Sequence, residues 1–104
     1  MKNVGVTLLA TAFIGCALAL QASAQDANLG RNLAATCTFC HGTDGRSVGG
    51  TVALAGMPKE QLVQAMKEFK SGARPATVMH QLSKGYTEQQ VELMGEYFSK
   101  QKIH

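Results

Sequence analysis

Five consecutive residues, Cys37-Thr38-Phe39-Cys40-His41, carry the strongest chemical signal in the chain. Two cysteines separated by two residues can each form a thioether with one vinyl group of a single porphyrin, whose vinyl spacing is fixed. A histidine directly after the second cysteine can then bind the iron from one side. C-x-x-C-H is the attachment pattern of c-type haem. The sequence therefore predicts one covalently bound haem c, with Cys37 and Cys40 as thioether residues and His41 as the proximal axial ligand.

Three other uses of paired cysteines fit the sequence less well. A thiol–disulfide redox couple is expected beside a βαβ unit, and the flanking residues show no strand pattern. A zinc site completed by His41 and His80 would lack the second pair of closely spaced ligands that is typical of zinc sites. A structural disulfide between Cys37 and Cys40 would close a very short loop and would remove little chain entropy.

The start of the chain has the pattern of a secretory signal peptide. Lys2 provides a positive charge, residues 4–20 are almost all apolar or small, and Ala22-Ser23-Ala24 is a small-x-small cleavage site. We therefore expect residues 1–24 to be removed and the protein to be periplasmic. Export agrees with the haem motif, because bacteria attach c-type haem after translocation.

Two alternatives to cleavage after Ala24 remain open. The apolar run is slightly longer than usual, so it could stay as a membrane anchor. Phe13-Ile14-Gly15-Cys16 loosely resembles a lipoprotein cleavage box, in which Cys16 would carry a lipid. Phenylalanine stands in that box where leucine is usual, and cleavage after Ala24 is therefore the favoured prediction.

Residues 25–104 are long enough for one small domain, a monohaem domain. Such a short chain buries little apolar surface and usually needs a disulfide or a cofactor. Both cysteines in this range are assigned to haem, so the haem itself is expected to form the centre of the core. The whole chain has ten Lys and Arg against seven Asp and Glu. It contains no basic run of the kind that indicates nucleic-acid binding.

Apolar periodicity and turn residues predict an all-α fold with four helical segments. These segments span residues 26–36, 58–71, 76–82 and 87 to about 102, and glycines make residues 42–56 a loop. Apolar side chains at helical spacing are expected to face the core: Leu29, Leu33, Leu62, Val63, Met66, Phe69, Val91, Leu93, Met94, Tyr97 and Phe98.

Capping residues support three of the predicted helix ends. Pro58 suits the first position of a helix, where a missing N–H costs nothing. Gly72 suits the stop of that helix. Thr87 and Gln90 have the spacing of a capping box at the start of the last helix.

The order of these segments resembles that of class I c-type cytochromes, in which a short helix runs into C-x-x-C-H and a last helix has an apolar-aromatic end. The resemblance implies a class I fold of about four short helices around one covalent haem. It also implies that the first and last helices cross closely. Gly30 and Gly95 are candidates for the point where their backbones approach.

The same resemblance implies a second axial ligand in the C-terminal half, and Met79 is the predicted distal ligand. Met79 lies between two helices at a family-like separation from His41. Met66 and Met94 lie on apolar stripes, where methionine usually fills a core. Met57 is too close to His41, and His80 is the open alternative, because imidazole also binds haem iron.

Further stretches resemble particular c-type cytochromes. The residues Cys40-His41-Gly42-Thr43-Asp44-Gly45 and Ser47-Val48-Gly49 look like a cytochrome c4-type haem loop. Phe69-Lys70-Ser71-Gly72, Thr77-Val78-Met79 and Lys84-Gly85-Tyr86 resemble the cytochrome subunit of flavocytochrome c sulfide dehydrogenase.

This closer resemblance implies one-electron transfer without catalysis by the chain alone. The partner would be an FAD-containing flavoprotein subunit that oxidises sulfide. Two alternatives stay open, a free periplasmic electron shuttle of the cytochrome c4, c5 or c553 type and, less favoured, a haem-based gas sensor. The gas sensor would need a labile sixth ligand and is disfavoured if Met79 binds the iron.

Two features of the predicted site concern its surroundings. Class I proteins often orient the proximal histidine with a proline carbonyl, but no proline lies between Gly42 and Met57. A carbonyl within Ser47–Gly50 is therefore expected to accept the Nδ1 proton of His41.

A second feature is a set of cations that could surround the haem edge and steer an acidic partner. With Glu60 and Glu68 among them, a mixed solvated surface is favoured for these cations: Lys59, Lys67, Lys70, Arg74 and Lys84.

Overall fold

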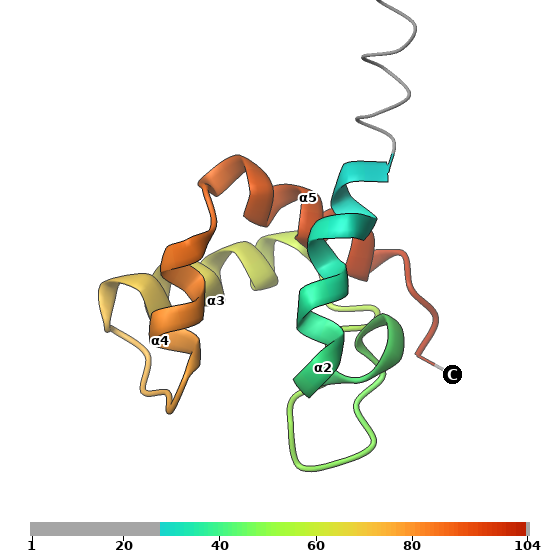
Figure 1. Cartoon of the computed structure of the whole chain (residues 1–104), viewed down its shortest axis with the longest axis horizontal. Helices are drawn as coiled ribbons and strands as arrows, with labels where there is room; N and C mark the ends of the chain where they lie inside the picture. Colours follow the sequence, from blue (N-terminus) through green and yellow to red (C-terminus); the bar gives the residue numbers. More distant parts are fainter. Residues whose placement is uncertain (1–27, 104) are drawn as a thin grey trace, which may run out of the picture.

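The computed structural model describes residues 28–103, and all of its regular structure in that range is helical. This confirms the predicted all-α fold (Figure 1). Residues 28–34 are helical and lead directly into the following elements. The elements in order are η1 (Ala35–Cys37), α2 (Thr38–His41), η2 (Thr43–Gly45), α3 (Lys59–Ser71), α4 (Met79–Leu82), η3 (Ser83–Gly85) and α5 (Glu88–Ser99).

The first helical segment continues through the cysteine motif and ends only at Gly42. Backbone angles stay right-handed helical from Ala34 to Thr38, and Gly42 then takes a positive φ of 85°. The expected end at Thr36 was therefore wrong, because Gly42 is the first residue after it that suits a left-handed stop. The expected start at residue 26 lies outside the described residues. C-x-x-C-H thus forms the last turn of a helix.

The predicted capping residues are found near the ends of α3 and α5. Thr87 and Gln90 form the predicted capping box, with Gln90 N donating to Thr87 Oγ1 at 3.1 Å. Gly72 ends α3 in the left-handed conformation, as predicted. Pro58 is the N-cap residue rather than the first helical residue, since its ψ of 138° is extended.

Two other helix ends differ from the prediction. The last helix ends at Ser99 rather than near residue 102, and the carbonyl of Phe98 accepts hydrogen bonds from both Gly56 N and Gln101 N. The short helix α4, predicted to begin at residue 76, begins at Met79, because the backbone of Val78 is still outside the helical region. Met79 is therefore the first residue of α4 rather than an internal residue of a helix.

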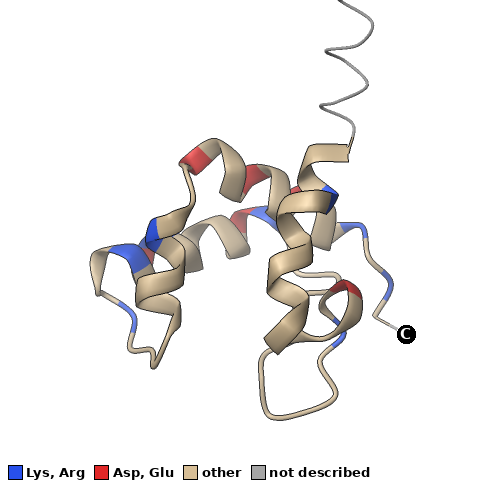
Figure 2. Cartoon of the chain, in the orientation of Figure 1, with Lys and Arg blue, Asp and Glu red and all other residues tan. Residues whose placement is uncertain are grey.

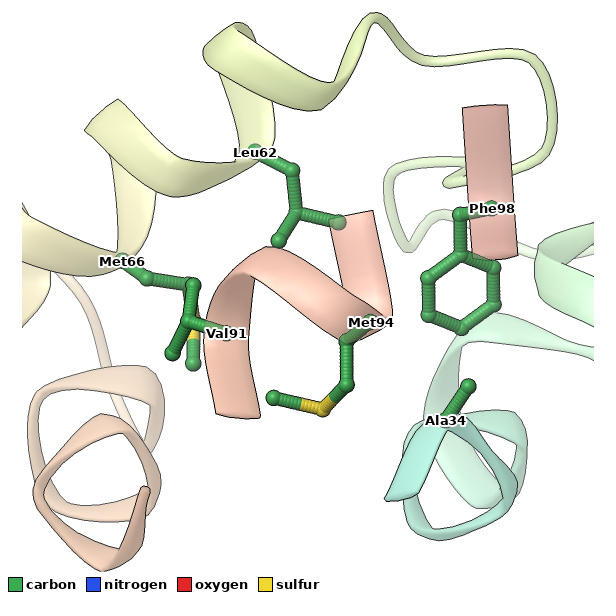
Figure 3. Packing of buried hydrophobic residues seen from close by; sticks show 6 residues of the cluster. All are labelled: Ala34, Leu62, Met66, Val91, Met94 and Phe98. Carbon is green, nitrogen blue, oxygen red and sulfur yellow. The ribbon is translucent and has the colours of Figure 1, made fainter. Parts of the chain in front are cut away.

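The core lies where α3, α5 and the first helical segment meet (Figure 3). Its buried members are Ala34, Leu62, Met66, Val91, Met94 and Phe98. Five of these six were predicted from periodicity. Ala34 was not predicted, and its methyl group points toward the Phe98 ring in Figure 3. A residue this small suits a place where two helices cross closely, since both Ala34 and Phe98 are fully buried.

Gly30 marks the predicted crossing of the first and last helices, whereas Gly95 does not. A Cβ atom added at Gly30 would lie 2.8 Å from the carbonyl oxygen of Leu93 in α5. A Cβ at Gly95 would instead lie 3.2 Å from the carbonyl oxygen of Lys59, at the start of α3. The expectation for Gly95 was wrong in its partner, because that face of α5 meets α3.

Within residues 28–103, no helix has both the length and the apolarity to cross a membrane. The predicted signal peptide, residues 1–24, lies outside the described residues. The alternatives for that segment, including lipidation of Cys16, lie outside them as well.

Candidate haem site

The cysteine motif places three reactive side chains on one side of a helix. Residues three or four apart in a helix are neighbours on its surface, which applies to Cys37 with Cys40 and to Cys37 with His41. Neither cysteine forms a disulfide. Cys40 is exposed, whereas Cys37 is partly buried and packs against the core. Burial raises the pKa of the Cys37 thiol, outweighing the opposite effect of its hydrogen bond with Thr36.

One hydrogen bond fixes the orientation of the His41 ring. Its Nδ1 lies 2.6 Å from the backbone carbonyl oxygen of Val52. A carbonyl oxygen can only accept, so Nδ1 carries the proton and donates it, which leaves the lone pair of the neutral ring on Nε2. The expected acceptor range of Ser47–Gly50 was therefore wrong by two residues. The loop must turn through its glycines before a carbonyl reaches the ring.

The loop that carries Val52 is tied down at both ends. The Gly45 carbonyl accepts hydrogen bonds from Leu54 N at 2.8 Å and from Ala55 N at 3.1 Å. Arg46 Nε donates to the Lys102 carbonyl at 2.7 Å. These bonds close the loop around the turn that follows His41. The position of the Val52 carbonyl is thus set by the backbone rather than by a proline.

The turn directly after His41 contains a strained residue held by α5. Asp44 has a φ of +51°, a left-handed conformation that costs a residue with a Cβ roughly 1 kcal/mol. Tyr97 donates its hydroxyl hydrogen to Asp44 Oδ1 at 2.6 Å. This bond, with smaller effects of burial and of the Asp44 charge, raises the pKa of Tyr97.

Tyr97 was expected to face the core, but its hydrogen bond to Asp44 was not predicted. The one local signal was the Asp44-Gly45 pair, which is typical of a tight turn. The contact between Asp44 and Tyr97, far apart in sequence, has no such signal.

Met79 lies at the start of α4, partly buried and packed against the core. α4 packs against α3, on the opposite side of Figure 1 from α2. Met79 and Leu82 are three residues apart and share a face of α4, and Leu82 and the preceding Val78 are about half exposed. This end of α4 therefore offers apolar surface and a thioether sulfur.

The other candidates for the distal position are placed differently. Met66 and Met94 are buried core residues, as predicted, while Met57 is partly buried against the core. His80 Nδ1 is buried and has no hydrogen-bond partner in the described part of the chain. The structure does not bring His80 into a ligand cluster: among residues 28–103, no three His, Cys, Asp or Glu side chains are grouped as metal ligands. The zinc alternative therefore has no ligand set there.

The donors present fit a c-type haem. Two unpaired thiols share a helix face with an imidazole whose Nδ1 proton is already engaged. A methionine thioether and apolar side chains lie on a separate element. Thiols for covalent attachment, a nitrogen and a thioether are the donors that haem c uses.

Two of the five predicted cations, Lys70 and Arg74, contact nearby acceptors. Arg74 Nη2 lies 2.6 Å from Glu68 Oε2, and Lys70 Nζ donates to the Tyr86 carbonyl at 2.7 Å. Figure 2 shows both signs of charge on α3 and acidic residues on α5. These contacts agree with a mixed solvated surface rather than a basic ring.

Comparison with known proteins identifies relatives of this chain. Residues 27–102 match the family model of Cytochrome c. The cytochrome subunit of sulfide dehydrogenase from Chlorobaculum tepidum is 41% identical over 69 residues, which cover 66% of this chain and 63% of that protein. Cytochrome c-553 from Nitratidesulfovibrio vulgaris is 32% identical over 98 residues, which cover 89% of this chain and 96% of that protein.

Coverage differs between relatives. Cytochrome c4 from Pseudomonas aeruginosa is 34% identical over 82 residues, covering 78% of this chain but 41% of that protein. The chain also spans less than two thirds of the sulfide dehydrogenase subunit that it matches. The match to the family model nevertheless runs from the first helical segment to the end of the chain's last helix. The helical frame, the C-x-x-C-H turn and this match together show that the chain belongs to the cytochrome c family, whose members carry electrons on covalently bound haem c.

Proposed function

We propose that Cys37 and Cys40 hold the haem through thioethers, that His41 binds the iron on the proximal side and that Met79 binds it on the distal side. The hydrogen bond from His41 Nδ1 to the Val52 carbonyl carries this proposal. It uses the one ring proton and directs the Nε2 lone pair away from the loop. Met79 is favoured over Met66 and Met94 because those two side chains are buried in the core.

Bound there, haem c supplies a one-electron couple between ferric and ferrous iron. The Val52 carbonyl holds the His41 ring in one tautomer and makes its free nitrogen more basic. A thioether ligand such as Met79 favours the ferrous state more than a second imidazole would. With both axial positions taken by side chains, the site has no open position for a substrate, so we infer electron transfer alone.

We further propose that the chain is the electron-accepting cytochrome subunit of a sulfide dehydrogenase, with an FAD-containing flavoprotein as its partner. The 41% identity to the Chlorobaculum tepidum subunit supports this proposal. Oxidation of sulfide removes electrons in pairs, whereas one haem accepts one. A flavin partner that separates the pair is therefore required.

A free electron shuttle remains the second candidate. The likeness to cytochrome c-553, which extends over nearly the full length of both chains, favours it. Either function would be carried out in the periplasm, after removal of residues 1–24 as a signal peptide. The sequence pattern of that segment supports this location.

Copurification with the flavoprotein distinguishes a permanent subunit from a free shuttle. The flavoprotein of sulfide dehydrogenase from the same organism would be tagged and co-expressed with this chain. The tagged protein would be captured on an affinity resin, and the resin would be washed at low and at high salt. A permanent subunit should elute with the flavoprotein in equal amounts after both washes. Loss of the cytochrome in the low-salt wash would contradict the subunit assignment and favour the shuttle.

A further inference from the structure

The segment that carries Met79 has few hydrogen bonds to the rest of the molecule. We call residues 75–86 the Met79 segment, which contains α4 and η3. In the described part of the chain, every hydrogen bond made by residues 75–85 has its partner within the Met79 segment. α4 and η3 are held against α3 by packing, and Ser83 in η3 is fully buried. The hydrogen bonds from this segment to other elements are therefore made by its last residue.

That last residue, Tyr86, is anchored at three points. Its hydroxyl oxygen lies 2.7 Å from Thr36 Oγ1. Thr36 Oγ1 itself donates to the Leu33 carbonyl at 3.0 Å, so the Tyr86 hydroxyl supplies the hydrogen of the bond between them. Lys70 Nζ donates to the Tyr86 carbonyl at 2.7 Å, and the Tyr86 side chain packs against the core. Tyr86 is thus tied to the first helical segment, to α3 and to the core.

The bond to Thr36 joins the two parts of the chain that carry the proposed haem ligands. Thr36 directly precedes Cys37 in a right-handed helical stretch, whereas Met79 lies in α4, on the opposite side of Figure 1 from α2. Among residues 28–103, this is the one hydrogen bond between residues 28–45 and the Met79 segment. Movement of α4 away from the cysteine motif would therefore break it.

The position of Tyr86 relative to Met79 allows this anchor to act on the sulfur. α4 begins at Met79 and continues directly into η3, which ends at the residue before Tyr86. The chain that enters α4 from the other side, residues 72–78, is exposed throughout. The Met79 segment is consequently fixed at its Tyr86 end.

We propose that Tyr86 is a positioning residue for the distal ligand, and that its hydrogen bond to Thr36 keeps Met79 on the iron against competing ligands. This inference rests on the proposed function, in which Met79 binds the iron. An external ligand can bind only after the Met79 sulfur has left. Departure of the sulfur moves the Met79 segment and breaks the bond to Thr36, so the bond stabilises the closed site and not the open one.

The test measures the binding of imidazole to the ferric, haem-loaded cytochrome. Imidazole replaces the sulfur and removes the weak near-infrared band that a sulfur–iron bond produces. Tyr86→Phe should bind imidazole about fivefold more tightly, the factor that corresponds to one hydrogen bond of ordinary net strength. Thr36→Val removes the acceptor and should have the same effect, whereas Thr36→Ser keeps a hydroxyl and should behave like the wild type. Without imidazole, the band should be present in every variant, because Met79 remains the ligand.

Two comparisons distinguish this role from a general loss of stability. The double variant of Tyr86→Phe and Thr36→Val should bind imidazole no more tightly than either single variant, because both changes remove the same bond. Thr87→Ala removes the side chain that caps α5, which lowers the free energy of unfolding to a similar extent but leaves the Tyr86 hydroxyl in place. Its imidazole affinity should stay within about twofold of the wild type.

Three outcomes would overturn the role of Tyr86. Wild-type imidazole affinity in Tyr86→Phe would show that the bond to Thr36 does not hold the ligand. Additive increases in the double variant would assign the two effects to separate causes. An equal increase in Thr87→Ala would make lower stability the cause. In all three cases the near-infrared band of the wild type would still identify a methionine ligand, whereas its absence from the wild type would defeat the proposed Met79 ligation itself.

Discussion

At the scale of single residues, two hydrogen bonds fix the surroundings of His41: His41 to Val52 and Tyr97 to Asp44. The first orients the imidazole. The second holds the left-handed residue in the turn between His41 and the loop. The partners are 11 residues apart in the first pair and 53 apart in the second, so this part of the site depends on how the loop folds and on α5.

Replacing Met79 by alanine tests the distal ligand. Ferric cytochrome with a methionine ligand shows a weak near-infrared band from charge transfer between sulfur and iron. Met79→Ala should abolish this band and lower the haem potential, because a thioether stabilises ferrous iron. The matched control His80→Ala should keep the band, since it alters only the next residue in α4. A band that survives in Met79→Ala would move the role to another methionine.

Replacing Tyr97 by phenylalanine tests the bond to the strained turn. Tyr97→Phe should reduce the free energy of unfolding by about 1 kcal/mol near neutral pH, the usual net value of one hydrogen bond. Urea unfolding of the haem-loaded protein measures this change.

The same pair also predicts a pH dependence. The pKa of Tyr97 is raised in the folded protein. Its contribution to stability is therefore present below the unfolded value of about 10 and is lost as pH rises through the folded value. The stability difference between wild type and Tyr97→Phe should shrink over that interval. Tyr86→Phe, which removes a hydroxyl bonded to neutral Thr36, serves as the control. A constant difference for Tyr97→Phe up to strongly alkaline pH would contradict the assignment.

Residue types and short spacings could be predicted from the sequence, but longer-range partners could not. The haem-binding residues of the motif Cys37-Thr38-Phe39-Cys40-His41 can be predicted from the sequence, because residues within one helical turn share a face. The acceptor for His41 depends on how a glycine-rich loop folds back. The resemblance to class I cytochromes and the missing proline led to an expected acceptor in Ser47–Gly50. The structure, with its backbone bonds to Gly45, places the acceptor at Val52.

At the scale of the elements, helix crossings depend on backbone approach. The Gly30 contact with Leu93 leaves no room for a side chain. Alanine there would gain up to about 1 kcal/mol of helix propensity but would force the helices apart at a cost of about 1–3 kcal/mol. The contact is with backbone, which cannot rotate away, so the cost should exceed the gain.

Gly30→Ala should therefore lower the thermal midpoint of the haem-loaded protein, as measured by circular dichroism. Asn32→Ala, at an exposed position of the same helical segment, is the control. It gains propensity without a clash and should be neutral or slightly stabilising. An equal or higher midpoint for Gly30→Ala would show that the crossing can relax.

Element type was more predictable than element ends. The capping box of Thr87 and Gln90 and the stop at Gly72 depend only on nearby backbone groups. The structure confirms both. The end of the last helix depends on tertiary contacts. The Phe98 carbonyl, for example, accepts a hydrogen bond from Gly56 in a distant loop. The partner of Gly95 likewise depends on which helix packs there.

At the scale of the whole molecule, charged residues are unevenly distributed along the sequence. Residues 32–58 contain only Asp44 and Arg46 as acidic and basic residues, whereas α3 carries both signs and α5 carries acidic residues. The attachment motif belongs to the uncharged part.

Electron transfer from sulfide through a flavoprotein is the central claim, and rapid mixing tests it most directly. The haem-loaded cytochrome, the flavoprotein and sulfide would be combined in a stopped-flow instrument under anaerobic conditions, with haem reduction followed by absorbance. Mixtures that omit the flavoprotein or the sulfide are the controls. The account predicts fast reduction only when all three are present. Reduction by sulfide that is equally fast without the flavoprotein, or that the flavoprotein fails to speed up, would contradict it.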